Sequence, residues 1–332
     1  MLRFLTYRAL SAIPVLFVMT IITFVIIHST PGDYADYVGM QLRVQGHATN
    51  EVAQAAAEQF RKDHGLNDPL IIQYFRWMWD VVRGDFGTSY FYNRPISEVI
   101  GQRLPASLGL ALIVHMIGTI IGVTLGVIAA TKQYSWVDSV LSFIGFLGLT
   151  TPKFLMALIL IYVLVFRLGV QELGSFYSSY WSYQPMSFGK LWNLIQHVWP
   201  IIFVGVFNGI SYNMRVMRAN LLDTLNAQYV ETARAKGLSN TAAVLKHAVP
   251  NALHPLAAYQ SSIVRYLIEG EIETSFIFGI PTIGVAIVLS MGIGDSLVTA
   301  TLMLMFGAFQ IIGSLLSDLL LAWLDPRVRL GT

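Results

Sequence analysis

Residues 229–256 read YVETARAKGLSNTAAVLKHAVPNALHPL, a polar stretch between two strongly apolar segments. Its first half consists of good helix formers up to Gly237, and a glycine there is typical of a helix end. Ser239 or Asn240 can then cap a second helix, which Pro250 is expected to break or kink. The stretch therefore predicts two short helices joined by a turn and held close to the neighbouring apolar segments.

The composition of the whole chain is that of a membrane protein. Of its 332 residues, 55% are hydrophobic and only 12% are charged. The formal net charge of +2 is too small to indicate a nucleic-acid partner, and the absence of cysteine excludes disulfides, thiolate metal sites and cysteine catalysis. The seven histidines show no metal-ligand spacing, so no metal site is expected.

Apolar segments long enough to cross a bilayer, about 20 residues each, occur six times in the chain. They cover residues 9–28, 107–130, 140–166, 194–214, 252–272 and 297–320. The first is too long for a signal peptide and lacks a cleavage site of small residues, so we expect it to be retained as an anchor. The fold class predicted is an all-α membrane protein with six transmembrane helices.

The distribution of basic residues predicts the orientation of the six spans. Both termini fall on one side, together with most basic residues of the short loops: Arg3, Arg8, Lys132, Arg215, Arg218, Arg234, Lys236, Lys246, Arg327 and Arg329. The short loop on the opposite side offers only Arg167 and Lys190. The positive-inside rule makes the first side cytoplasmic.

Four regions follow from this topology. The N-terminal tail and first span cover residues 1–28, and a long external loop follows over 29–106. A five-helix transmembrane core covers 107–325 and includes a cytoplasmic loop at 223–250, before a C-terminal tail at 326–332. A loop of this length is too long to be a simple link, and it contains amphipathic pieces such as PLIIQYFRWMWDVV, so we expect it to fold on the outer face.

The cytoplasmic loop carries the spacing E-x-A-x-x-x-G, formed by Glu231, Ala233 and Gly237, with Pro250 thirteen residues further on. This pattern resembles the EAA loop of permease subunits from ABC importers, although Thr232 replaces the usual alanine. The resemblance implies that the first short helix is a coupling helix, which docks in a groove of a separate ATPase subunit. Glu231 would then be a polar anchor and Gly237 the site of a sharp backbone turn.

The resemblance extends along nearly the whole chain, to permeases of dipeptide and oligopeptide importers. It is carried by STPGDY, HGLNDPLIIQYFRWMWDVVRGDFGTSY, RPISEVIGQRLPASL, ETSFIFGIPTIG and LLAWLDPRVR, in this order. The long first external loop is similar to that of the first of the two permeases in such systems. The fold implied is that of a type I ABC importer permease.

The partners and location follow from the same resemblance. A second homologous permease, two ABC ATPase subunits and an external solute-binding protein are implied, in a bacterial or archaeal plasma membrane. The chain has no P-loop, since SFGKLW matches only its Gly-Lys, so it is expected to be a transport subunit and not an enzyme. We expect it to bind no cofactor, with ATP and Mg held by the ATPases, and its external loop to help seat the binding protein.

Two other classes of function remain as alternatives. A secondary transporter or channel would work without ATP, but the sequence shows no repeat with inverted topology. An intramembrane enzyme would need a nucleophile and base or paired metal ligands, and the spans contain neither. The cargo stays open among dipeptides, oligopeptides, nickel chelates, glutathione and oligosaccharides.

Lys153 follows Pro152 in the middle of the third predicted span, where relatives tend to have a small or apolar residue. The proline is expected to kink the helix and leave a backbone carbonyl free. One interpretation is a lysine that snorkels or pairs internally. The other is a polar point in the translocation pathway.

The fifth predicted span carries charges on one helical face. Arg265, Glu269 and Glu273 are spaced four residues apart, and Gln260 adds a polar group earlier in the same span. Glu271 points elsewhere, about 120° from Arg265. One interpretation is that Arg265 and Glu269 pair as i,i+4 neighbours while the other glutamates reach water. The other is that Arg265 and Glu269 line the outer half of the pathway, where the excess of three carboxylates over one arginine would favour cationic or neutral cargo.

Overall fold

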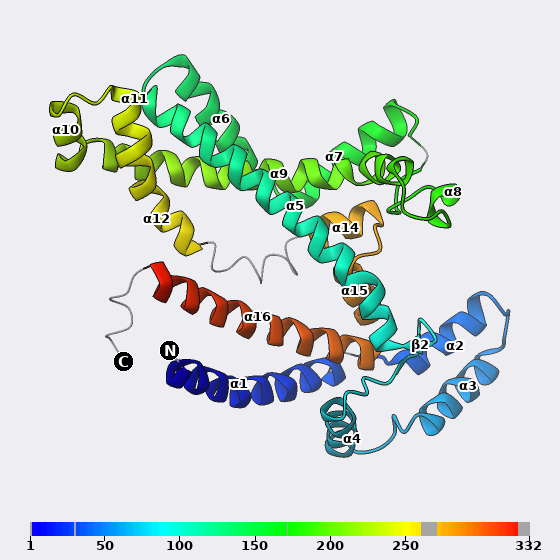
Figure 1. Ribbon diagram of the computed structural model, residues 1–332. Helices are drawn as coiled ribbons and strands as arrows, with labels where there is room; N and C mark the ends of the chain where they lie inside the picture. The colour runs from blue at the N-terminus through cyan, green and yellow to red at the C-terminus, as the bar shows by residue number, and fades with distance from the viewer. Residues whose placement is uncertain (1, 30, 171, 260–270, 325–332) are drawn as a thin grey trace. The chain divides into compact units, whose positions relative to one another are not determined.

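The computed structural model describes residues 2–29, 31–170, 172–259 and 271–324, which are almost entirely helical (Figure 1). Within these ranges the strands are β1 (Thr88–Ser89) and β2 (Arg94–Pro95), which pair antiparallel. The chain divides into two compact units. Unit 1 combines Met1–Ala106 with Thr282–Leu315, and unit 2 combines Ser107–Pro281 with Leu316–Thr332.

The expectation of an all-α membrane protein is confirmed. Among the residues that the structure describes, four segments are long and apolar enough to cross a membrane: Leu10–Val44, Ile96–Thr131, Phe188–Leu225 and Ser296–Leu315. Two bent helix pairs raise the number to six if each pair is one span: Trp136–Thr150 with Lys153–Arg167, and Ile272–Phe278 with Ile283–Ile293.

The second bent pair contains the motif ETSFIFGIPTIG and is interrupted between Phe278 and Ile283. Gly279 adopts a left-handed conformation with φ +68° and Pro281 follows it, and this combination reads as a loop signal in the sequence. The apolar helix that begins at Ile283 continues beyond the interruption. Most of the predicted fifth span, at residues 260–270, lies outside the described residues.

Unit 1 contains the N-terminal helix, the predicted external loop and part of the C-terminal region. Its helices are α1 (Leu2–Ser29), α2 (Tyr34–Val44), α3 (Asn50–Asp63), α4 (Leu70–Val82), the start of α5 (Ile96–Thr131), α15 (Ile283–Ile293) and most of α16 (Ser296–Leu324). α1 and α16 lie side by side (Figure 1), and Gly307 of α16 leaves room for the Met19 side chain of α1. Because the predicted external loop contains α2, α3 and α4, it is a folded layer and not a flexible link.

A cluster of hydrogen bonds and ion pairs around Asp33 fixes the start of the folded loop and gives the STPGDY motif a structural role. Gly32 has φ +94°, and Asp33 caps α2 by accepting a hydrogen bond from the Asp36 amide at 3.0 Å. Arg61 of α3 donates to the carboxylates of Asp33 at 2.8 Å and Asp36 at 2.6 Å. Gly294 lies so close that an added Cβ would come within 2.7 Å of the Asp33 carbonyl carbon.

Asp295 ties the layer to the start of α16. Its buried carboxylate accepts hydrogen bonds from Ser89 Oγ at 2.7 Å and from the Phe91 amide at 3.1 Å. Burial raises the pKa of Asp295 above its ordinary value, and the hydrogen bonds only partly offset this effect.

Unit 2 is built around α9 (Phe188–Leu225). The other elements are the rest of α5, α6 (Trp136–Thr150), α7 (Lys153–Tyr162), the π-helical turn η1 (Val163–Arg167), α8 (Ser179–Ser182), α10 (Gln228–Ala235), α11 (Asn240–Ala243), the π-helical turn η2 (Val244–Ala248), α12 (Val249–Tyr259) and α14 (Ile272–Phe278). Gly118, Gly122 and Gly126 let α5 approach α9 closely, as small residues at four-residue spacing commonly do in membranes. An added Cβ at Gly122 would lie 2.8 Å from the Asn213 Cβ.

The predicted kink at Pro152 is confirmed, because α6 and α7 meet at 97° there. Pro152 has no N–H to donate to the Gly148 carbonyl, its partner one helical turn earlier. The Asn208 side chain of α9 donates to this carbonyl instead, at 3.0 Å. The break therefore leaves no unsatisfied carbonyl at Gly148.

Of the break or kink predicted at Pro250, the break is wrong. The chain remains helical, with η2 leading directly into α12, and Pro250 lies in the first turn of α12. A π-helical turn changes the hydrogen-bond register, and proline is tolerated near a helix start, so no interruption is required.

Candidate functional site

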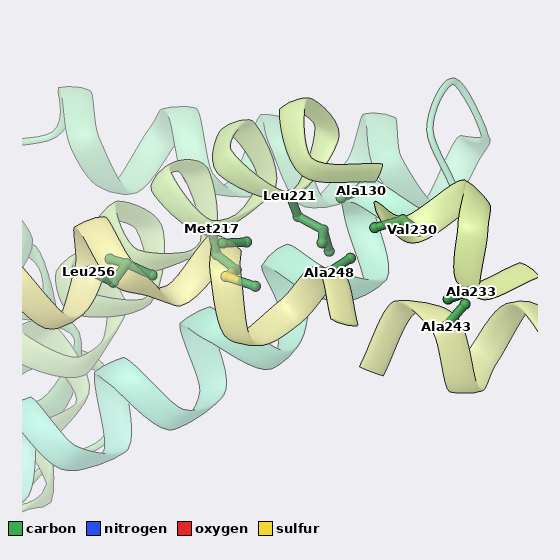
Figure 2. Packing of buried hydrophobic residues seen from close by; sticks show 9 residues of the cluster. Ala130, Met217, Leu221, Val230, Ala233, Ala243, Ala248 and Leu256 are labelled. Atoms are coloured by element: carbon green, nitrogen blue, oxygen red, sulfur yellow. The ribbon is translucent and has the colours of Figure 1, made fainter. Parts of the chain in front are cut away.

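The predicted coupling loop is anchored to unit 2 through one face of α10. Val230 is fully buried and Ala233 is 7% exposed. They belong to an apolar cluster that joins α5, α9, α10, α11 and α12 (Figure 2): Ala130, Met217, Leu221, Val230, Ala233, Ala243, Ala248, Ala252 and Leu256. Because close-packed interiors transmit strain, a movement of α10 would displace the side chains of these helices that pack against it.

The other face of α10 is open. Glu231 and Thr232 are exposed, and the Thr232 hydroxyl donates to the Gln228 carbonyl of its own helix at 2.8 Å. The residues of the predicted motif thus lie on two faces of α10: Ala233 is directed into the unit, and Glu231 and Thr232 are directed outward. Such an arrangement presents a short, rigid helix to a partner surface.

The turn after α10 has the geometry expected for its glycine. Gly237 has φ +90°, and no heavy atom lies within 4 Å of an added Cβ, so only backbone conformation requires glycine there. Arg234 crosses the turn and donates to the Asn240 side chain at 3.1 Å. Ser239 is the residue that caps the next helix, by accepting from the Ala242 amide at 3.3 Å.

Lys153 pairs within unit 2, as one of the two interpretations held. Its Nζ lies 3.8 Å from Oε1 of Glu271, at the start of α14. The Glu271 side chain is only 5% exposed, and its Oε2 accepts a hydrogen bond from the Thr274 hydroxyl at 2.6 Å. Gly205 of α9 makes room for this carboxylate, because an added Cβ would lie 2.6 Å from Oε1. This ion pair links the start of α7 to the start of α14.

Sequence reasoning did not foresee the partner of Lys153. Glu271 was separated from the charged face of the fifth span, and Glu273, which was placed on that face, is exposed on α14. The available signal was that Lys153 and Glu271 are both charged residues inside predicted spans, where charges are rare and usually paired. Gln260, Arg265 and Glu269 lie outside the described residues. Within the described ranges, no three histidine, aspartate or glutamate side chains are placed to hold a metal ion.

Two family models cover the chain almost completely. Residues 1–111 match the N-terminal model of binding-protein-dependent transport system membrane components, and residues 122–330 match the binding-protein-dependent transport system inner membrane component. The chain belongs to this family. It is therefore a permease of the inner membrane and a transport subunit, not an enzyme, and its transport depends on a binding protein and ATPase partners.

Relatives of this permease match over its full length. The oligopeptide transport system permease protein AppB of Bacillus subtilis (strain 168) is 33% identical over 99% of this chain and 100% of its own. A putative peptide permease of Brucella suis biovar 1 (strain 1330) is 32% identical over 99% of both chains. The dipeptide transport system permease protein DppB of Alkalihalophilus pseudofirmus is 31% identical over 99% of this chain and 100% of its own.

Proposed function

We propose that this permease forms half of a translocation pathway for peptides, in complex with a second homologous permease. Two ABC ATPase subunits bind ATP and Mg on the cytoplasmic side, an external solute-binding protein delivers the cargo, and this chain holds no cofactor. It crosses the membrane six times in the manner of a type I importer, with both termini in the cytoplasm. The observation that carries the coupling role is α10, which is anchored through Val230 and Ala233 and open through Glu231 and Thr232. The peptide cargo is proposed from the names of the relatives.

Coupling follows from the way α10 is held. When ATP closes the ATPase pair, a groove that grips the exposed face of α10 moves the helix together with Gly237 and its turn. The cluster around Val230 passes this movement to α5, α9 and α12. Movement of the pathway requires that ATP binds the outward-open state more tightly than the inward-open state, since only differential affinity shifts such an equilibrium.

The pathway residues are a second part of the proposal. Lys153, Gln260, Arg265, Glu269 and Glu273 lie along the pathway. The three carboxylates of Glu269, Glu271 and Glu273 outnumber the two basic groups of Lys153 and Arg265, and this acidic excess favours cationic or neutral peptides over anionic ones. The pairing of Lys153 with Glu271 is the internal pairing of the other interpretation, so the pathway assignment of Lys153 rests on its position inside a predicted span at a helix break. Glu269→Gln and Glu271→Gln variants, given peptides that differ only in charge, should lose this preference. An unchanged preference and rate in both would make the charges structural.

Transport by the purified complex in proteoliposomes tests the function as a whole. Uptake of a labelled di- or tripeptide should require ATP, magnesium and the loaded binding protein. Uptake driven by an ion gradient without ATP would identify a secondary transporter instead. Uptake of oligosaccharides with no uptake of peptides would retain the importer and overturn the peptide cargo.

A further inference from the structure

The external helix α4 has an apolar face that is largely exposed. Ile71, Phe75, Trp79 and Val82 are 62%, 58%, 59% and 74% exposed. Their spacing of four, four and three residues places them on one side of the helix. An uncovered face of this kind, made of large side chains, indicates an interaction surface.

A different face of α4 packs against α1 inside a segment long and apolar enough to cross a membrane. The Tyr74 hydroxyl lies 2.8 Å from Thr20 Oγ1, and the Trp77 ring stacks on Phe24 at 5.9 Å between ring centroids. Thr20 is nine residues before Ser29, where α1 ends, or about 13 Å along the helix axis. Because an apolar span is about 30 Å long, these contacts lie inside the part of α1 that would cross the bilayer, and α4 docks below the outer end of α1.

The direction of α4 agrees with this position. Figure 1 shows α4 nearly end-on beside the C-terminal half of α1, so α4 runs across α1 and not along it. If α1 crosses the bilayer, α4 lies close to the membrane plane. This is the orientation of interfacial amphipathic helices, which bury an apolar face about 5–10 Å into the boundary.

A third side of α4 is polar and faces away from the apolar side chains. Gln73, Arg76 and Asp80 line a cavity of about 190 Å³ together with the turn that follows α3 at His64–Leu66 and the turn at Asp85. Arg76 also pairs with Asp68 at 2.7 Å. The helix thus separates an apolar side from a polar side, with its docking face between them.

We propose that the Ile71–Phe75–Trp79–Val82 face of α4 is buried in the leaflet on the side of the external loop, in contact with lipid acyl chains. The neighbouring face of α1 supports lipid as the occupant, because its exposed side chains Phe17, Ile21 and Val25 are also apolar. At the polar boundary, Arg83 lies 4.3 Å over the Trp79 ring, a pair suited to the headgroup region. A soluble binding protein is a poor match, since its release would return four large apolar side chains to water.

Single-cysteine spin labels test this proposal directly, because the natural chain has no cysteine. Ile71→Cys and Phe75→Cys are labelled in the assembled complex in nanodiscs, with Glu51→Cys and Lys62→Cys of α3 as exposed controls. At positions 71 and 75 we expect high accessibility to oxygen and at least tenfold lower accessibility to a water-soluble nickel chelate than at the controls. Adding the binding protein should leave these values unchanged.

Each other result would overturn the proposal. High accessibility to the nickel chelate, followed by immobilisation when the binding protein is added, would assign the face to that protein. Inaccessibility to both reagents would assign it to the second permease. A photoactivatable phospholipid provides a measurement without any substitution: its adducts should map to residues 70–82 of the unmodified chain. Neither measurement requires transport, so failure here is distinct from failure of the proposed function.

Discussion

Replacing Arg218 by methionine should destabilise the permease strongly, because it strands a buried carboxylate. Arg218 of α9 donates to Asp138 of α6 through Nε at 2.7 Å and Nη2 at 2.8 Å. The Asp138 side chain is 5% exposed, whereas that of Arg218 is 29% exposed. After the substitution, Asp138 retains only the Tyr134 amide at 3.0 Å and the Ser142 hydroxyl at 3.2 Å.

The two partners of this pair should therefore respond unequally. Removing one partner of a buried pair costs about 3–5 kcal/mol, and we expect about 3 kcal/mol for Arg218→Met, since two donors remain on the carboxylate. Asp138→Asn should cost only about 1 kcal/mol, because the partly exposed guanidinium of Arg218 can turn to water. The double variant Asp138→Asn/Arg218→Met should be more stable than Arg218→Met alone, because it no longer buries an unpaired charge.

Equilibrium unfolding of the purified chain in mixed micelles, titrated with dodecyl sulfate, measures these differences. The matched control is Arg215→Met, an exposed arginine one turn earlier on α9. The reasoning is refuted if Arg218→Met lies within about 0.5 kcal/mol of the natural chain. It is also refuted if Asp138→Asn is as destabilising as Arg218→Met.

Three further predictions concern single positions. Asn208→Leu should cost about 1–3 kcal/mol in the same unfolding assay, since it leaves the Gly148 carbonyl without a donor at the Pro152 break; a neutral result would show that another group satisfies it. Gly237→Val should reduce ATP-driven uptake more than Gly237→Asn, because asparagine tolerates positive φ better, and equal uptake by both would remove the need for glycine at φ +90°. Asp295 binds its proton more tightly in the folded than in the unfolded state, so its contribution to stability falls as pH rises through the interval between the ordinary and the raised pKa. Asp295→Asn should therefore flatten the pH dependence of unfolding in this acidic interval, and an identical slope would contradict the assignment.

The features that local sequence determines were predictable. The helical ending at Gly237, the cap at Ser239 and the kink at Pro152 each depend on a few neighbouring residues, and all three are present. The folded character of the external loop was also predictable, from its length and the amphipathic pattern of α4.

The features that tertiary contacts determine were not predictable from one sequence. Glu271 meets Lys153 only because Gly205 leaves space for its carboxylate between α9 and α14. Asn208 is sixty residues from the carbonyl that it satisfies. The π-helical turn before Pro250 replaces a predicted break, because a change of hydrogen-bond register accommodates proline and leaves no trace in local propensity.

Stimulation of ATP hydrolysis by the loaded binding protein, measured in proteoliposomes with the Glu231→Ala complex, tests the coupling role of α10 most directly. The matched control is Asp223→Ala, an exposed acidic residue at the end of α9. We predict that Glu231→Ala assembles and binds the loaded binding protein normally but loses most of the stimulation and of the uptake, whereas Asp223→Ala retains both. Normal stimulation and uptake by Glu231→Ala, at equal amounts of assembled complex, would contradict the role of α10 as the coupling helix.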